Sequence, residues 1–295
     1  MLLRNSTSGE FDVYNVAPNS NNVTGSASLL GTVGLNWRVM GFGNFGSFGR
    51  TDMMLRDDNT GVIEIYNINN NKIVNNNPTG SVGTNWQFSG IGNFSGRGTS
   101  DMLLRDANTG RLRAYNINSN PITGSAFIGT VGLDWQFSGV GNFSSAPGES
   151  DLLLRNSSTG ALQVYDINNN KLTGTAFIGT IGLDWQFAGV APVSAAGASD
   201  LVLRNVNNGV FQVYNIANNR LTGSASLGTV GLDWQLGGFA ASSPTGSMRS
   251  SDSTSQLVQA MAGFGGEGGA ADGLNVAAVG ADTSQQTFLT TPQHA

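Results

Sequence analysis

Short runs of alternating and continuous hydrophobic positions recur along the chain at even intervals. In one copy, residues 135–143 (WQFSGVGNF) alternate, residues 151–155 (DLLLR) are continuously apolar, and residues 161–167 (ALQVYDI) alternate again. Alternation with a period of two is typical of a half-buried strand, and a short apolar run bounded by Gly, Ser and Asn is typical of a strand covered on both faces. With a fourth strand predicted near residues 175–182 (TAFIGTIG), each copy contains four strands.

The copies are one sequence unit repeated five times between residue 1 and about residue 240. The five tryptophans follow one another at intervals of 49, 49, 50 and 49 residues, and a Leu-Arg step and a tyrosine recur in phase with them. A fixed period of this length is the signature of a repeat architecture. The anchors are Trp37, Trp86, Trp135, Trp185 and Trp234; Arg4, Arg56, Arg105, Arg155 and Arg204; and Tyr14, Tyr66, Tyr115, Tyr165 and Tyr214.

Four strands in about 49 residues match one blade of a β-propeller, in which small sheets are arranged radially and bury their faces against their neighbours. We therefore expect an all-β fold, a β-propeller of about five four-stranded blades over residues 1–241. Strand exchange between the two ends would close the ring; the alternative is a truncated array from a larger propeller. The expected blades lie near residues 37–85, 86–134, 135–184 and 185–233, with a composite blade made of residues 1–36 and 234–241.

The repeat is lost after residue 241, and residues 242–295 form a tail rich in Gly, Ser and Ala. We expect a flexible segment with one short amphipathic helix over residues 256–264. Its glycine-rich, weakly acidic end resembles the uncleaved signals of type I secretion substrates of Gram-negative bacteria. That resemblance implies an extracellular or cell-surface bacterial protein, and the alternative is a tail without a targeting role.

Composition excludes several classes of protein. Charged residues make up 11% of the chain and the formal net charge is −5, which argues against a nucleic-acid partner because such a partner requires a basic surface. The chain has no cysteine, so it forms neither disulfides nor thiolate metal sites. No apolar run reaches the length of about 18 residues that a membrane span requires.

Catalytic signatures are scarce in the repeats. The single histidine is His294, next to the C-terminus, and the four glutamates do not recur at a fixed position of the repeat. A His-based triad and the paired carboxylates of glycoside hydrolysis are therefore not encoded. We expect a protein without enzymatic activity.

An acidic residue and an arginine recur four positions apart in the second strand of the repeat. The spacing places both on one face of the strand. We interpret them as a structural ring of ion pairs, or as turn-capping hydrogen bonds that set blade register, with a repeated polar ligand site as the alternative. The pairs are Asp52 and Arg56, Asp101 and Arg105, Asp151 and Arg155, and Asp200 and Arg204.

An Asp or Asn directly precedes each tryptophan. A carboxylate or amide beside an aromatic ring is what a neutral saccharide site needs, because the ring stacks on the sugar and the polar group binds its hydroxyls. The alternative is that the tryptophans are core residues between blades. The candidate ligand-binding residues are Asn85 and Trp86, Asp134 and Trp135, Asp184 and Trp185, and Asp233 and Trp234.

The segment GNFSGRGTSDMLLRDANTG (residues 92–110) resembles the FG-GAP or VCBS repeats of integrin α-subunit propellers and of many bacterial surface proteins. That family's loops bind calcium through carboxylates. Here the corresponding positions are Asn93, Ser95 and Arg97, and only Asp101 is retained. We therefore expect no cofactor and no metal site, with calcium disfavoured. The repeat period is also similar, more weakly, to that of propeller lectins of the tachylectin type.

These patterns favour a multivalent, lectin-like binding module whose partner is a glycan or polysaccharide. The first alternative is a protein-interaction or structural propeller of a bacterial adhesin, and the second is a calcium-binding repeat protein. A protein-binding face would vary between blades, whereas a common ligand site would not. One third-strand position varies in this way; its residues are Asp12, Glu64, Arg113, Gln163 and Gln212.

Overall fold

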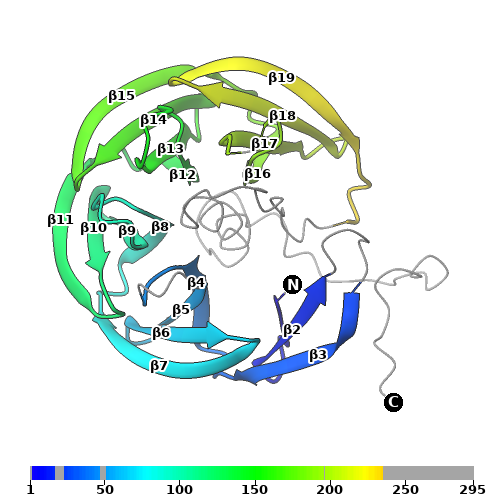
Figure 1. Cartoon of the computed structure of the whole chain (residues 1–295). Helices are drawn as coiled ribbons and strands as arrows, with labels where there is room; N and C mark the ends of the chain where they lie inside the picture. Colours follow the sequence, from blue (N-terminus) through cyan, green and yellow to red (C-terminus); the bar gives the residue numbers. More distant parts are fainter. Residues whose placement is uncertain (1, 17–22, 47–50, 196, 235–295) are drawn as a thin grey trace.

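The chain folds into a five-bladed β-propeller in the computed structural model, which describes residues 2–16, 23–46, 51–195 and 197–234 (Figure 1). All secondary-structure elements in these ranges are strands, and they form five antiparallel sheets arranged around a central axis. No helix long and apolar enough to cross a membrane occurs among the described residues. The predicted all-β propeller is confirmed.

Four sheets have four strands each, connected in sequence order from the centre of the ring to its rim (Figure 1). Their strands lie within the blade ranges expected from the tryptophan spacing. They are β4 (Trp37–Gly43), β5 (Asp52–Asp57), β6 (Val62–Asn69) and β7 (Lys72–Ser81); β8 (Trp86–Gly92), β9 (Asp101–Asp106), β10 (Arg111–Ile117) and β11 (Ile122–Thr130); β12 (Trp135–Gly141), β13 (Asp151–Asn156), β14 (Ala161–Asn168) and β15 (Lys171–Thr180); and β16 (Trp185–Ala191), β17 (Asp200–Asn205), β18 (Val210–Ala217) and β19 (Arg220–Thr229).

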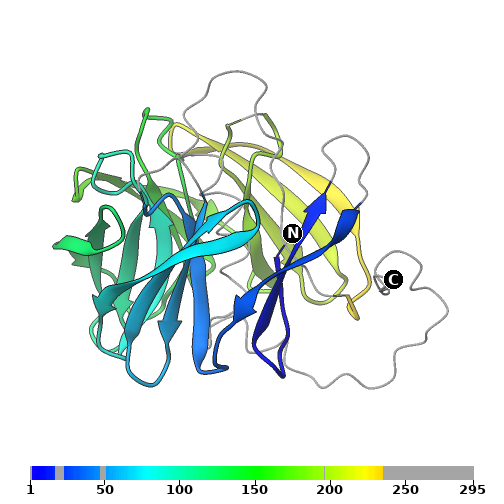
Figure 2. The same cartoon turned by 60° about the horizontal axis from the view of Figure 1, so that its bottom comes forward.

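The N-terminal sheet contains β1 (Leu2–Arg4), β2 (Glu10–Val16) and β3 (Val23–Thr32), and it lies beside the β4–β7 sheet in both views (Figures 1 and 2). By sequence, β1 corresponds to the second strand of the other blades. Trp234 is the last described residue, so the rest of the strand expected over residues 234–241 lies outside the described residues and the composite blade stays a prediction. The tail of residues 242–295 and its expected helix at 256–264 also lie outside them.

The continuously apolar second strand is buried on both sides because neighbouring sheets pack face to face. In β13, Leu152 and Leu154 join a core cluster with residues of the β8–β11 sheet, whereas Leu153 joins a cluster with residues of the β16–β19 sheet. All three leucines are almost completely buried. Burying a leucine side chain stabilises a fold by about 1.5–3 kcal/mol. Because successive side chains of a strand point to opposite faces, β13 packs against the sheets on both of its sides.

A bulge in the first strand brings the inner strands close together. The register of β12 against β13 shifts between Phe137 and Gly139, and Gly139 has a φ of 136°. A Cβ atom at Gly139 would lie 2.3 Å from Cγ2 of Val190 in the next blade. Only glycine fits there, since the site combines a positive φ with close contact between blades.

Asparagines form the tight turns between the third and fourth strands, as the sequence predicts. Asn169 and Asn170 have φ values of 49° and 59°, the left-handed pair that a two-residue hairpin turn requires. The preceding turn uses Gly160 at φ 73°, where a Cβ would lie 1.9 Å from the Ile181 carbonyl oxygen.

A hydrogen bond between a carboxylate and an amide ties the start of each first strand to the end of its second strand. The amide of Asn36 donates to Asp57 (2.5 Å), and in another blade the amide of Asn156 donates to the carboxylate of Asp134 (2.5 Å). The two residue types are exchanged between blades, but each pair keeps one amide and one carboxylate. The remaining pairs are Asn85 with Asp106 (2.6 Å) and Asn205 with Asp184 (2.6 Å).

Closure of the ring would place Asp233 opposite Asn5, because these residues hold the same two positions of the repeat. Asn5 already caps its turn, since its Oδ1 accepts from the backbone N–H groups of Thr7 (2.8 Å) and Ser8 (2.9 Å), as Asn156 does in its blade. Asn5→Asp would therefore set two carboxylates against each other. We predict that it lowers the free energy of unfolding by about 1 kcal/mol and that adding Asp233→Asn restores it.

Urea unfolding of the two single variants and the double variant measures this coupling. Additive effects of the two substitutions would show that Asn5 and Asp233 do not meet and would reject strand exchange.

Candidate binding site

Two faces of the ring carry the segments between strands. We call connector face the side formed by the residues that join one blade to the next, which are 33–36, 82–85, 131–134, 181–184 and 230–233. We call hairpin face the opposite side, where the first strand turns into the second and the third into the fourth. The predicted Asp or Asn and Trp residues lie at the connector face, and the aspartates that begin the second strands lie at the hairpin face.

Each repeat arginine reaches from the end of its second strand to the connector of the next blade. In one blade, Nη1 of Arg105 donates to the carbonyl oxygen of Trp135 (2.5 Å) and Nη2 donates to that of Gly132 (2.6 Å). The same two carbonyls are bound in every other blade. The other contacts are Arg4 with Trp37 and Gly34, Arg56 with Trp86 and Gly83, Arg155 with Trp185 and Gly182, and Arg204 with Trp234 and Gly231. We call this contact the arginine clamp.

The predicted ring of ion pairs is wrong. Asp101 and Arg105 lie at opposite ends of β9, and four residues of extended strand span about 13 Å, well beyond the reach of an ion pair. Among the described residues, the ion pair that forms is between Arg38 and Asp58 (3.0 Å). The same correction applies to Asp52 with Arg56, Asp151 with Arg155, and Asp200 with Arg204.

The four aspartates instead cap the loops at the hairpin face, which was the other structural interpretation of the pattern. Asp101 is completely buried; its Oδ2 accepts from the backbone N–H of Ser95 (2.7 Å) and its Oδ1 from that of Ile117 (3.1 Å). The equivalent Oδ2 contacts are Asp52 with Gly46 (2.9 Å), Asp151 with Ser144 (2.7 Å) and Asp200 with Ser194 (2.6 Å).

The hairpin face has its own contacts between blades. The hydroxyl of Ser150, next to Asp151, accepts from the backbone N–H of Asn93 in the preceding blade (2.8 Å), and the carbonyl of Phe94 accepts from the N–H of Asn170 (2.7 Å). Each of the four four-stranded sheets is therefore fixed to the next at both faces of the ring.

The tryptophans are half-buried between blades. Trp135 packs against the cluster shared by the β8–β11 and β12–β15 sheets, Trp185 packs against the next cluster, and the Trp86 ring meets that of Tyr115 edge-on with centroids 6.4 Å apart. Trp37, Trp86, Trp135 and Trp185 are each partly exposed, and Trp234 is 53% exposed. The tryptophans therefore pack between blades, as the alternative interpretation expected. Their exposed part lies at the connector face, where a ligand could contact it.

The polar residues beside four of the tryptophans, which are Asn36, Asn85, Asp134 and Asp184, are exposed or partly exposed but already have hydrogen-bond partners. Asp134 is exposed, and one of its oxygens accepts from the amide of Asn156. Leu133, which precedes it, is 58% exposed, and Leu35, Leu183 and Leu232 are exposed in the same position. In the connectors of residues 33–36, 131–134 and 181–184, the chain thus places an exposed leucine, a member of an amide–carboxylate pair and a partly exposed tryptophan at consecutive positions. The leucine was missed by the sequence prediction, although it recurs in phase with the tryptophan.

The loops that resemble calcium loops use their oxygens within the protein. Oδ1 of Asn93 accepts from the N–H of Gly98 (3.0 Å), and both carboxylate oxygens of Asp101 accept from backbone N–H groups. Within the ranges that the structure covers, no cluster of three or more His, Cys, Asp or Glu residues is placed to hold a metal ion.

Comparisons with known proteins find likeness in fold alone. No family model and no curated protein matches the chain, so membership of the FG-GAP family stays a prediction. Among solved structures, the chain is similar to dihydro-heme d1 dehydrogenase NirN (13% identity, TM-score 0.42, 77% of this chain and 47% of that one). It is also similar to an auxiliary nutrient binding protein from Bacteroides thetaiotaomicron (10%, 0.42, 78% and 58%) and to the calcium-binding protein regucalcin from Agrobacterium tumefaciens (11%, 0.33, 76% and 72%).

The chain thus spans about half the length of the first two of these structures. The expectation that the protein has no enzymatic activity is contradicted by this comparison, because a dehydrogenase is among the proteins with a similar sheet arrangement. The scarcity of histidine and of placed glutamates excludes particular mechanisms and does not exclude catalysis.

Stability should depend on pH through Asp151. Burial raises the pKa of its carboxyl from 3.8 to about 6, against the hydrogen bonds from Ser144. The folded state therefore binds this proton more tightly than the unfolded state does, and its contribution lowers the free energy of unfolding as pH rises from about 4 to about 6. We predict that Asp151→Asn removes this contribution, because an amide oxygen still accepts from the Ser144 N–H.

Urea unfolding of the wild type and Asp151→Asn at several pH values between 4 and 7 measures the difference. The control is Asp57→Asn, since the hydrogen bond from the Thr60 backbone N–H lowers the pKa of Asp57. Its contribution is lost only as pH falls below about 4, so this variant should differ from the wild type by a constant amount over this range. A stability difference between wild type and Asp151→Asn that stays constant over this range would contradict the prediction.

Proposed function

We propose that the propeller is a multivalent binding module that recognises carbohydrate through equivalent sites on its connector face. The observation that carries the proposal is the recurrence, at the same place in successive connectors, of an exposed Leu, an amide–carboxylate pair and the exposed edge of a tryptophan. In the connector of residues 131–134 these groups are Leu133, Asp134 with Asn156, and Trp135. The connector of residues 82–85 has Thr84 in place of the leucine.

The chemistry of each connector suits a sugar. The C–H face of a pyranose packs on exposed apolar and aromatic surface, and its hydroxyls both donate and accept hydrogen bonds. An amide and a carboxylate side by side offer both functions. The carboxylate of Asp134 interacts electrostatically with the guanidinium of the arginine clamp in the same connector, Arg105. The two charges offset each other, which fits a neutral glycan better than a charged one.

Repetition compensates for weak single sites. Each connector contributes few side chains to a site, so we expect the affinity of one site to be low. Several sites on one rigid ring raise the apparent affinity for a polyvalent glycan by 10²–10⁴-fold without any additional contact. Such a target is typical of cell surfaces and exopolysaccharides, and this supports the proposed extracellular or cell-surface location.

A second candidate function is protein binding in a surface adhesin, favoured by the rim of the ring. Phe127 on β11 is 51% exposed and Phe177 on β15 is 65% exposed, although large apolar side chains are normally covered. They lie opposite Arg113 and Gln163, members of the third-strand position that varies between blades. A blade-specific apolar rim is what a protein partner recognises.

A glycan array probed with the full chain separates the two functions. We predict saturable binding that is unchanged by calcium or EDTA and that falls about twofold with Asp134→Ala but more than tenfold with Asp134→Ala and Asp184→Ala combined, because avidity is lost with each site. The matched controls are Gln163→Ala and Gln212→Ala, which change the variable position and leave the connectors intact.

Loss of binding in the Gln163 and Gln212 variants, with binding kept in the aspartate variants, would move recognition to the rim. Loss of binding in EDTA would support the calcium alternative, and an array without any bound glycan would reject the proposal.

A further inference from the structure

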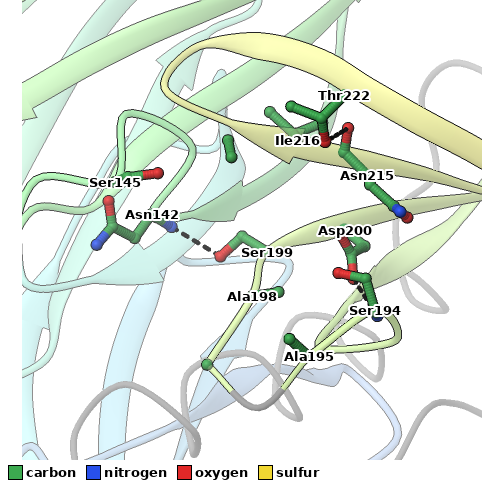
Figure 3. Close-up of a pocket in the computed structure, with 12 residues that line it drawn as sticks. Asn142, Ser145, Ser194, Ala195, Ala198, Ser199, Asp200, Asn215, Ile216 and Thr222 are labelled. Carbon is green, nitrogen blue, oxygen red and sulfur yellow. Dashed lines mark hydrogen bonds between the residues drawn. The ribbon is translucent and has the colours of Figure 1, made fainter.

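A pocket of about 410 Å³ opens on the hairpin face between the β12–β15 and β16–β19 sheets, away from the connectors (Figure 3). Its polar lining includes Asn142 and Ser145 from one blade and Ser194, Asp200 and Asn215 from the next. Sites for small ligands usually measure about 300–1,000 Å³, so the pocket is large enough for one.

The pocket exists because two side chains that fill the equivalent space in the preceding blade are absent. There, Glu149 accepts from the amide of Asn168 (2.8 Å) and from the hydroxyl of Ser144 (3.0 Å), and these contacts close the space beside Asp151. The corresponding positions beside Asp200 are Ala198 and Ala217, and both line the pocket. Two alanines in place of a hydrogen-bonded pair thus distinguish this interface from its neighbour.

Two acceptor atoms in the pocket lining are buried without a partner. Asp200 is 1% exposed; its Oδ2 accepts from the N–H of Ser194 (2.6 Å), and its Oδ1 has no hydrogen bond. Oδ1 of Asn215 is also buried and unpartnered. In Asp101 the equivalent Oδ1 accepts from the Ile117 N–H, whereas Oδ1 of Asp52 and of Asp151 is also unpartnered. Beside Asp151, the hydrogen-bonded Glu149 and Asn168 hold the positions that the two alanines hold beside Asp200. A buried acceptor without a donor costs about 1–3 kcal/mol, and more when it is charged.

The missing group is therefore a hydrogen-bond donor with positive charge. The pocket lining contains a carboxylate but no lysine or arginine, and a buried carboxylate is normally paired with a cation. A metal ion is a poor match because hard cations require several oxygen ligands of high charge, and the lining offers one carboxylate. A primary ammonium group has three N–H donors, which suit the Asp200 and Asn215 oxygens together with one hydroxyl.

We propose that this pocket binds the primary ammonium group of a small organic amine or of a lysine-like side chain, with Asp200 as its counter-ion. The site lies on the face opposite the connectors. It goes beyond the proposed carbohydrate function, since neither depends on the other.

Saturation-transfer NMR on the full chain at pH 7 tests the assignment with two isosteric probes, n-propylamine hydrochloride and propan-1-ol. We expect saturable binding of propylammonium and at least tenfold weaker binding of the alcohol. Asp200→Asn keeps the acceptor for Ser194 but removes the charge, and it should weaken propylammonium at least tenfold. Asp151→Asn, the same change in the closed neighbouring interface, should leave binding unchanged.

A second variant, Ala198→Glu with Ala217→Asn, copies the residues that close the preceding interface and should abolish binding while the protein stays folded. Equal binding of the amine and the alcohol, propylammonium binding that survives Asp200→Asn, or no propylammonium binding to the wild type would each overturn the proposal. Loss of propylammonium binding in Asp134→Ala with Asp184→Ala would also overturn it, because it would place the amine on the connector face.

Discussion

The arginine clamp is the contact on which the ring of sheets depends. One guanidinium per blade donates to two backbone carbonyls of the following connector, in all five cases that the described residues contain. The Gly132 carbonyl belongs to a turn, in which it also accepts from the Trp135 N–H (3.1 Å), and Trp135 is the first residue of β12. The arginine therefore adds a charged donor to carbonyls at the point where one blade passes into the next. Hydrogen bonds to a charged group contribute about 1.5–3 kcal/mol each. The planar guanidinium also fixes the angle between blades, since both bonds form only in one orientation.

The other features of the connector follow from this contact. The tryptophan carbonyl must face the arginine, and its indole then packs between the sheets while its edge stays exposed. The amide–carboxylate pair holds the start of the first strand in the position that the clamp requires. The proposed carbohydrate sites are therefore the exposed surface of the connectors that the arginine clamp holds in place. Because the clamp recurs, these sites would be similar from blade to blade.

Much of the fold was predictable from the sequence, and the reason is repetition. The spacing of the tryptophans predicts the blades, and the apolar run at residues 151–155 predicts a strand buried on both faces, because sheet packing depends mainly on hydrophobic periodicity. The role of Arg105 was not predictable, since its partners are main-chain carbonyls and carry no side-chain identity. The pairing of residue 36 with residue 57 left a signal, because the positions exchange Asn and Asp between blades. That exchange could have predicted the amide–carboxylate pairs, in place of the wrong assignment of ion pairs between the aspartates and arginines of the second strands.

At the pocket, one repeat differs from the preceding repeat at two positions. Ala198 and Ala217 indicate no function when their blade is considered alone. Comparison with the preceding blade shows that they replace Glu149 and Asn168, whose hydrogen bond closes the equivalent space. Equivalent positions in the repeats stabilise the ring, whereas the pocket depends on a difference between them. The proposed connector sites use positions that are equivalent between blades, whereas the proposed amine site uses positions that differ between them.

The most direct test of the central claim is the free energy of unfolding of Arg105→Lys, measured by urea denaturation beside Arg113→Lys on the variable third-strand position. A lysine keeps the charge but cannot donate to both carbonyls from one planar group. The clamp predicts a loss of about 2–4 kcal/mol for Arg105→Lys and a change within about 0.5 kcal/mol for Arg113→Lys. Equal, small effects for both variants would contradict it.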